Sequence, residues 1–136
     1  MTEQETRELI RRRQEGFTGY CGVQIDEAAH GVCRAHVDLE ARHLNPLGFA
    51  HGGLQSTLMD VAAGCAAITA FDPPRMMVTQ SAEAHYLRPC SGGRLTAEAR
   101  TVKAGRYVAF VQVDVTDGEG RVVTAGSFEL FYLQEP

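Results

Sequence analysis

Residues 52–68 read GGLQSTLMDVAAGCAAI, and the expected fold follows from this segment. Asp60 is the one charged side chain between Arg42 and Asp72. On a helix the segment is apolar on nearly every side, so we predict a buried helix over about residues 52–70. A buried carboxylate loses solvation unless it is paired or hydrogen-bonded. Asp60 is therefore either a catalytic group or a carboxylate satisfied by neighbouring donors for structural reasons alone.

The segments on both sides of this helix alternate in polarity with the period of a strand. Residues 22–39 predict a β-hairpin with a break near Ala29-His30-Gly31, and four further strands are expected near residues 76–88, 94–103, 106–116 and 121–133. In the third of these, Tyr107 is expected on one face with Ala109, Val111, Val113 and Val115. Short turns join antiparallel neighbours, and a single long apolar helix needs a cover. We therefore predict an α+β fold in which a curved antiparallel sheet wraps the helix.

The chain as a whole is expected to form one domain over residues 1–136. Thr2 and Glu5 fit a capping box, and Leu9, Ile10 and Phe17 suggest the apolar stripe of a short peripheral helix within residues 1–18. Residues 41–51 form the loop that leads into the long helix, which Asp72-Pro73-Pro74 ends.

Composition and residue spacing argue against several classes of partner and cofactor. Thirteen Lys and Arg against seventeen Asp and Glu give a net charge of −4, which argues against a nucleic-acid partner. No segment has the length of a membrane span and the N-terminus is polar, so we expect a cytoplasmic protein that does not bind membranes. Neither the cysteines nor the histidines have the spacing of metal ligands, so no metal is expected. These residues are Cys21, Cys33, Cys65, Cys90, His30, His36, His43, His51 and His85.

Residues 45–53, NPLGFAHGG, come just before the predicted helix and suit a site for acyl transfer. The first turn of a helix has unpaired N–H groups and the positive end of the helix dipole, so the amide of Gly52 or Gly53 can stabilise an oxyanion. The alternative is that Gly52-Gly53 only supports a tight turn into the helix, with His51 as its cap.

Several motifs in order carry a family resemblance: Asn45-Pro-x-Gly-x-x-His-Gly-Gly, Asp60 nine residues after His51, Tyr86-Leu87-Arg88-Pro89, Ala104-Gly105-Arg106, and the turn at 117–120. Over residues 20–133 the chain resembles the hotdog-fold acyl-CoA thioesterases, and it is most similar to the phenylacetyl-CoA thioesterase-like branch of the 4-hydroxybenzoyl-CoA thioesterase superfamily. The resemblance implies a long helix wrapped by five or six antiparallel strands, homodimers joined edge to edge, homotetramers built from two dimers, and hydrolysis of acyl-CoA without a cofactor.

The resemblance also implies roles for particular residues. Gly52 matches the oxyanion donor, and Asp60 matches the carboxylate that acts as nucleophile or general base. Asn45 and His51 match residues that position the thioester or the water, and Thr79 matches a hydroxyl that helps to hold the water.

Arg88 and Arg106 match basic residues that meet the phosphates of CoA, and Gly53 is expected to contact the substrate. Each of these residues has a plainer alternative. Asn45 can form an Asx turn, Thr79 can be an ordinary strand hydroxyl, and both arginines can be solvated edge residues.

Gly52 and Asp60 are eight residues apart, which is about 12 Å along a helix. One helix cannot place both on one carbonyl, so each site is expected to take the two residues from different subunits of a dimer. The function expected is hydrolysis of an aryl- or medium-chain acyl-CoA. The alternatives are a hotdog hydratase or dehydratase that acts on acyl thioesters, and a sensor that binds acyl-CoA without catalysis.

Overall fold

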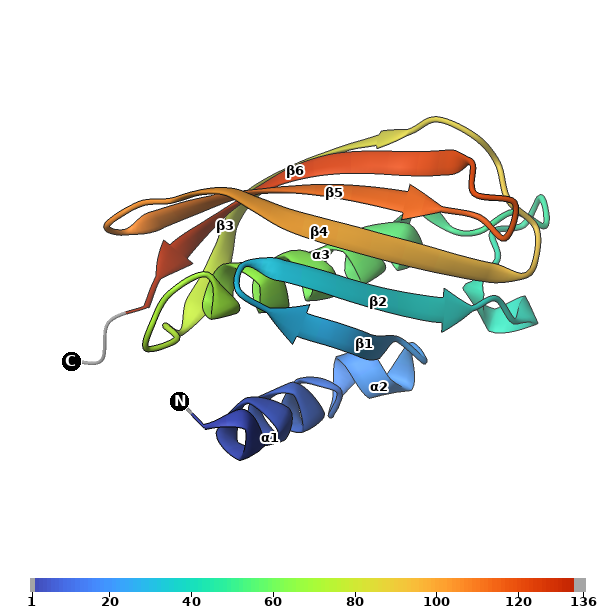
Figure 1. Cartoon of the computed structure of the whole chain (residues 1–136). Helices are drawn as coiled ribbons and strands as arrows, with labels where there is room; N and C mark the ends of the chain where they lie inside the picture. Colours follow the sequence, from blue (N-terminus) through green and yellow to red (C-terminus); the bar gives the residue numbers. More distant parts are fainter. Residues whose placement is uncertain (1, 134–136) are drawn as a thin grey trace.

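The computed structural model describes residues 2–133 (Figure 1). Met1 and residues 134–136, which the single domain predicted over 1–136 includes, lie outside the described residues. The elements in chain order are α1 (Glu3–Arg13), α2 (Phe17–Tyr20), β1 (Gln24–Ala29), β2 (Val32–Asp38), the 3-10 helix η1 (Ala41–His43), α3 (Gly52–Thr69), β3 (Met77–Tyr86), β4 (Arg94–Ala104), β5 (Val108–Thr116) and β6 (Val122–Tyr132). No helix within residues 2–133 is both long and apolar enough to cross a membrane.

The six strands form one antiparallel sheet in the order β1-β2-β4-β5-β6-β3. The register shifts in β1, β3 and β4, at Ile25/Glu27, Thr79/Ser81 and Thr101/Lys103. Such bulges bend a strand and increase its twist. In Figure 1 the sheet curves around α3, which confirms the predicted fold of a long helix wrapped by antiparallel strands. β1 and β3 are the two edges of the sheet.

The core lies between α3 and the concave face of the sheet. Ala109, Val111, Val113 and Val115 of β5 are buried, as their alternation predicts. Tyr107 was expected on the same face, but it precedes β5 and its side chain is 43% exposed. The second half of α3 is rich in small residues, which lets neighbouring elements approach the helix closely: Ala62, Ala63, Gly64, Cys65, Ala66 and Ala67 are all buried.

Two helices form at the N-terminus, where the sequence suggested one apolar stripe. The capping box is confirmed, because Thr2 Oγ1 accepts from the Glu5 amide at 3.1 Å while the Glu5 carboxylate accepts from the Thr2 amide at 2.7 Å. Gly16, two residues after the Gln14 C-cap of α1, has a φ of +65° and is the N-cap of the short α2. Leu9 and Ile10 are half-buried against the core, but Phe17 is 66% exposed. Figure 1 shows α1 at the edge of the molecule, below β1.

Candidate active site

Helix α3 leaves one stripe uncovered, and Asp60 lies on it. Gly53 and Asp60 are exposed, and Ser56, Thr57 and Val61 beside them are half-buried. The prediction that Asp60 is buried is therefore wrong for the single chain. The sheet covers α3 on one side only, and the adjacent edge strand β3 is itself exposed along most of its length.

Asp60 is held by a hydroxyl from the neighbouring edge strand. Thr79 Oγ1 donates a hydrogen bond to Asp60 Oδ1 at 2.6 Å. The bulge in β3 follows directly at Thr79/Ser81, so Thr79 stays on the face that meets the helix. Among the described residues, Asp60 Oδ2 has no hydrogen-bond donor. The carboxylate thus has one oxygen fixed by Thr79 and one available to a substrate or a water.

His51 caps the helix and leaves one free amide beside it. His51 Nδ1 accepts from the Gly53 N–H at 2.8 Å. A neutral imidazole that accepts at Nδ1 carries its proton on Nε2, so His51 can donate a second hydrogen bond outward. The Gly53 amide is used by this cap. The Gly52 N–H belongs to the first turn, which has no intrahelical acceptors, and it has no acceptor within residues 2–133.

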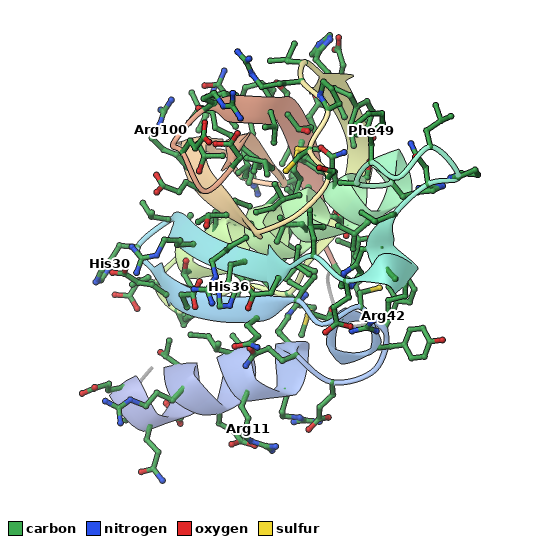
Figure 2. All side chains as sticks on the ribbon, turned by 90° about the vertical axis from the view of Figure 1, so that its right-hand side faces the viewer. Arg11, His30, His36, Arg42, Phe49 and Arg100 are labelled. Atoms are coloured by element: carbon green, nitrogen blue, oxygen red, sulfur yellow. The ribbon has the colours of Figure 1, made fainter. Side chains whose placement is uncertain are left out.

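Asn45 shapes the loop that brings His51 to the helix start. Its side-chain oxygen accepts from the amides of Leu47 at 2.9 Å and Phe49 at 3.1 Å, which is an Asx turn. Its own amide donates to the Phe49 carbonyl at 2.7 Å. The oxygen of Asn45 therefore serves the loop, and its side-chain NH2 group is what it has left to offer a ligand. Figure 2 shows Phe49 on the opposite side of the sheet from Arg100 and His36.

Tyr86 packs against Gly52. A Cβ on Gly52 would lie 3.4 Å from the Tyr86 ring. The Tyr86 hydroxyl is also hydrogen-bonded to Ser56 Oγ, one turn along α3. β3 and α3 therefore run in opposite directions, with Thr79 beside Asp60 at one end and Tyr86 beside Gly52 at the other.

Two buried polar residues that support the site were missed by the sequence reasoning. His43 is 5% exposed; its Nδ1 accepts from the Glu40 amide at 2.9 Å and its Nε2 donates to the Cys21 carbonyl at 2.8 Å. Gln55 is 6% exposed, and its side chain donates to the Ala50 carbonyl at 3.0 Å and accepts from Thr124. These hydrogen bonds hold the loop of residues 41–51 against the segment at Cys21 and against α3. Neither residue stands out in the sequence, because His43 follows Arg42 and Gln55 precedes Ser56, so each has a polar neighbour.

The two arginines predicted to meet CoA lie near opposite ends of helix α3. Arg88 is exposed just after β3, near the start of α3, and its amide donates to the Val123 carbonyl at 3.1 Å. Arg106 is exposed in the turn between β4 and β5, with its guanidinium 5.3 Å from the Tyr107 ring centre. Its carbonyl accepts from Arg75, which follows the end of α3. Within one chain the two side chains therefore do not meet.

The cysteine of α3 is part of the core and not of the open stripe. Cys65 is 4% exposed and is hydrogen-bonded to Cys33, which is also buried. The two thiols therefore belong to the core. No group of three or more His, Cys, Asp or Glu side chains in residues 2–133 is placed to hold a metal ion.

A groove of about 600 Å3 runs along the open stripe, between α3 and the inner face of β3. Its walls combine the Asp60 carboxylate with small and apolar side chains: Phe17, Thr18, Ser56, Thr57, Asp60, Val61, Ala82, Ala84, Tyr86 and Phe128. A carboxylate, a hydroxyl that orients it and a free helix N-terminus are the parts that hydrolysis of an acyl group requires. In one chain the carboxylate and the free amide are too far apart for one carbonyl.

The chain is similar to known thioesterases in sequence and in structure. Residues 47–124 match the family model described as Thioesterase superfamily. Proofreading thioesterase EntH of Klebsiella pneumoniae is 26% identical over 105 residues, which are 77% of each chain. Human acyl-coenzyme A thioesterase 13 is 29% identical over 129 residues, which are 90% of this chain and 91% of that protein.

Among solved structures, a mutant of the phenylacetic acid degradation protein PaaI from Thermus thermophilus superposes with a TM-score of 0.79. It is 31% identical, and the match covers 86% of this chain and 98% of that one. Escherichia coli PaaI has a TM-score of 0.87 at 18% identity and supports the fold alone. The matched model spans more than half of the chain, so this protein belongs to the thioesterase superfamily and is a thioester hydrolase with the hotdog fold.

Proposed function

We propose that this protein hydrolyses acyl-CoA thioesters of aryl or medium-chain acids, at sites that two copies of the chain build together. The observation that carries the proposal is the pairing of Asp60 with Thr79 on an exposed stripe of α3, eight residues from the free amide of Gly52. Human acyl-coenzyme A thioesterase 13 is named for acyl-CoA thioesters. The aliphatic and aromatic lining of the groove suits an apolar acyl group.

The arrangement of α3 and β3 supports a shared site. Eight residues separate Gly52 from Asp60, about 12 Å on the helix, while both reacting groups must lie within about 3 Å of the carbonyl. Because β3 runs antiparallel to α3, a two-fold axis near Ser56 would bring Thr79 and Asp60 of one copy to Tyr86 and Gly52 of the other. It would also pair the two free β3 edges and cover both open stripes.

In the proposed reaction the thioester oxygen accepts from the Gly52 amide and from His51 Nε2–H. The partner subunit's Asp60 attacks the carbonyl carbon, or it takes a proton from a water that attacks. The negative charge that develops on the oxygen is stabilised by the two donors and by the helix dipole. When the tetrahedral intermediate collapses, the C–S bond breaks, and the CoA thiolate leaves and takes up a proton. Where Asp60 is the nucleophile, a water then hydrolyses the mixed anhydride, which releases the acid and restores the carboxylate; where Asp60 is the base, the proton that it took from the water goes to the thiolate.

The other predicted residues have supporting roles in this proposal. Thr79 orients the carboxylate, and Asn45 holds the loop and offers its NH2 group to the substrate. Arg88 meets the CoA phosphates from the copy that supplies Gly52. Arg106 lies near the other end of α3, so it would reach the same CoA from the copy that supplies Asp60.

The direct test is release of free CoA thiol from a panel of acyl-CoA thioesters by Asp60→Asn. This change keeps the shape of the side chain and removes the base, so we expect turnover to fall at least about a hundredfold. Asp114→Asn is the matched control, because Asp114 is an exposed carboxylate on β5, outside the groove. Folded Asp60→Asn protein with parental turnover would refute the role of Asp60. A parent protein inactive on the whole panel would favour the sensor.

A further inference from the structure

A second cavity, of about 280 Å3, opens beside the first turn of α3, between this helix, α2 and the loop after η1. No residue of β3 lines it, so it lies on the other side of the open stripe from the edge strand. Figure 2 shows Arg42 next to α2, where its guanidinium donates to the Tyr20 carbonyl at the rim of this cavity. We call the cavity the α2 pocket; its lining includes Phe17, Cys21, Leu44, His51, Leu54 and Thr57.

The α2 pocket borders the groups that are proposed to bind the thioester. His51, which caps α3, and Gly53 and Thr57 of the open stripe all line it. Phe17 and Thr57 also line the groove that contains Asp60, so the two cavities share a wall and meet at these two side chains. A carbonyl held by His51 Nε2–H therefore has the α2 pocket directly beside it.

The polar groups in the wall of the α2 pocket already have partners in the chain. Thr57 Oγ1 donates to the Gly53 carbonyl at 2.9 Å. Both ring nitrogens of His43 are hydrogen-bonded, to the Glu40 amide at 2.9 Å and to the Cys21 carbonyl at 2.8 Å. A polar ligand group would lose its water here and find few free partners, which costs free energy. The pocket therefore suits an apolar ligand.

The position of Arg88 indicates which part of a thioester the α2 pocket would hold. Arg88 follows β3, so the proposed contact with the CoA phosphates places the CoA arm on the β3 side of α3. The acyl arm then leaves the carbonyl on the opposite side, toward α2. A cavity of about 150 Å3 can hold benzene. The 280 Å3 of the α2 pocket therefore has room for one aromatic ring or for an alkyl chain of similar bulk.

We propose that the α2 pocket binds the far end of the acyl group, and that the preferred acyl groups are aryl or medium-length chains with an apolar end. This inference rests on the proposed thioesterase function and adds the place of the acyl group. Each methylene that enters the pocket should raise kcat/KM about fourfold until the pocket is full, which is the scale of burying one methylene. A carboxylate at the end of the chain should cancel this gain, because the pocket offers it no partner.

The simpler alternative is that the α2 pocket is only a gap in the packing between α2 and α3. Cys21→Phe separates the two possibilities, because it adds a ring to the wall of the pocket and leaves Gly52, His51 and Asp60 unchanged. Cys90→Phe is the matched control: Cys90 is the other half-buried cysteine, and it does not line the pocket.

The first measurement is kcat/KM for acetyl-, butanoyl-, hexanoyl- and octanoyl-CoA, and for octanedioyl-CoA, which has the length of octanoyl-CoA and a terminal carboxylate. We expect the parent values to rise with chain length, and octanedioyl-CoA to be at least about tenfold worse than octanoyl-CoA. Cys21→Phe should keep the parental value for acetyl-CoA and lose the rise beyond butanoyl-CoA. Cys90→Phe should keep the whole rise.

The second measurement uses Cys21 as a reporter of binding that does not depend on turnover. Iodoacetamide alkylates exposed thiols, and the rate at each cysteine is followed by the mass of its peptide. S-octyl-CoA, a thioether that cannot be hydrolysed, should slow alkylation of Cys21 about tenfold at ten times its Kd. S-methyl-CoA, which has the same nucleotide and no chain, should leave the Cys21 rate unchanged. Neither thioether should change the rate at Cys90.

Equal losses on acetyl-CoA and octanoyl-CoA in Cys21→Phe would overturn the inference in favour of packing. Hydrolysis of octanoyl-CoA by the parent enzyme would also overturn it if S-octyl-CoA leaves Cys21 unprotected. If the parent enzyme hydrolyses none of the esters, the proposed function fails as a separate result. In that case protection of Cys21 by S-octyl-CoA alone decides whether the pocket binds an acyl chain.

Discussion

Replacing Thr79 by valine tests whether the hydroxyl on β3 positions the reacting carboxylate. Valine keeps the branched shape that suits a strand and removes the hydrogen bond of 2.6 Å to Asp60 Oδ1. A hydrogen bond to a charged group contributes about 1.5–3 kcal/mol. Since about 1.4 kcal/mol corresponds to a tenfold change in rate, kcat should fall about 10- to 100-fold. KM should change little, because Thr79 contacts the carboxylate and not the substrate.

The assay is thiol release under saturating acyl-CoA, with the melting temperature recorded for each variant. Thr79→Ser should recover most of kcat, because serine restores the donor. Ser81→Ala is the matched control: Ser81 Oγ donates to Glu129 at 3.1 Å, a hydrogen bond of the same kind on the neighbouring residue pair of β3 and β6, away from Asp60. A folded Thr79→Val enzyme with parental kcat would refute the reasoning. So would equal losses in the valine and serine variants.

Two further predictions concern CoA and acid stability. Arg88→Ala and Arg106→Ala should raise KM for CoA esters and leave short thioesters without the nucleotide unchanged; equal effects on both substrate types would count against phosphate contacts. The backbone amides of Arg121 and Glu119 hold the pKa of the Asp117 carboxyl below its ordinary value, so the stabilisation it gives is fully present above about pH 4 and is lost as the pH falls from there through the lowered pKa. Asp117→Ala should therefore lower the melting temperature at pH 7 much more than at pH 3, and an equal shift at both pH values would contradict this.

Most of the fold could be predicted from local patterns. The helix expected over residues 52–70 is observed as Gly52–Thr69, because a cap at its start and Asp72-Pro73-Pro74 after its end limit it on both sides. The hairpin break near His30-Gly31 is also confirmed: both residues have positive φ, which suits a two-residue turn between twisted strands. Alternation of apolar residues located each remaining strand to within a few residues.

What the sequence could not supply is the surroundings of each side chain. Hydropathy made Asp60 look buried because α3 is apolar almost all round, but it cannot separate residues covered by the chain's own sheet from residues left for another surface. The contact between Thr79 and Asp60 joins residues 19 apart through the pairing of an edge strand with the helix. His43 and Gln55 are invisible for a similar reason, since their partners are backbone groups of other segments. The single domain, the site roles and the dimer remain predictions.

The central claim is that each site takes Asp60 and Thr79 from one chain and His51 and Gly52 from the other. Gly52→Pro removes the backbone donor at the first helical position, where proline is tolerated, so it should be nearly inactive, as should Asp60→Asn. A mixed dimer of these two variants has one site with both defects and one with neither. A 1:1 mixture that exchanges subunits freely should therefore regain about a quarter of the parental activity.

The control mixture combines Asp60→Asn with Thr79→Val, whose defects lie on the same side of the site. Every site in that mixed dimer keeps one defect, so no activity beyond that of the Thr79→Val protein should return. The decisive measurement is the thiol-release rate of both mixtures after subunit exchange has been verified by mass. We expect recovery in the Asp60→Asn and Gly52→Pro mixture alone. No recovery there, with both variants folded and exchanged, would contradict a site shared between two chains.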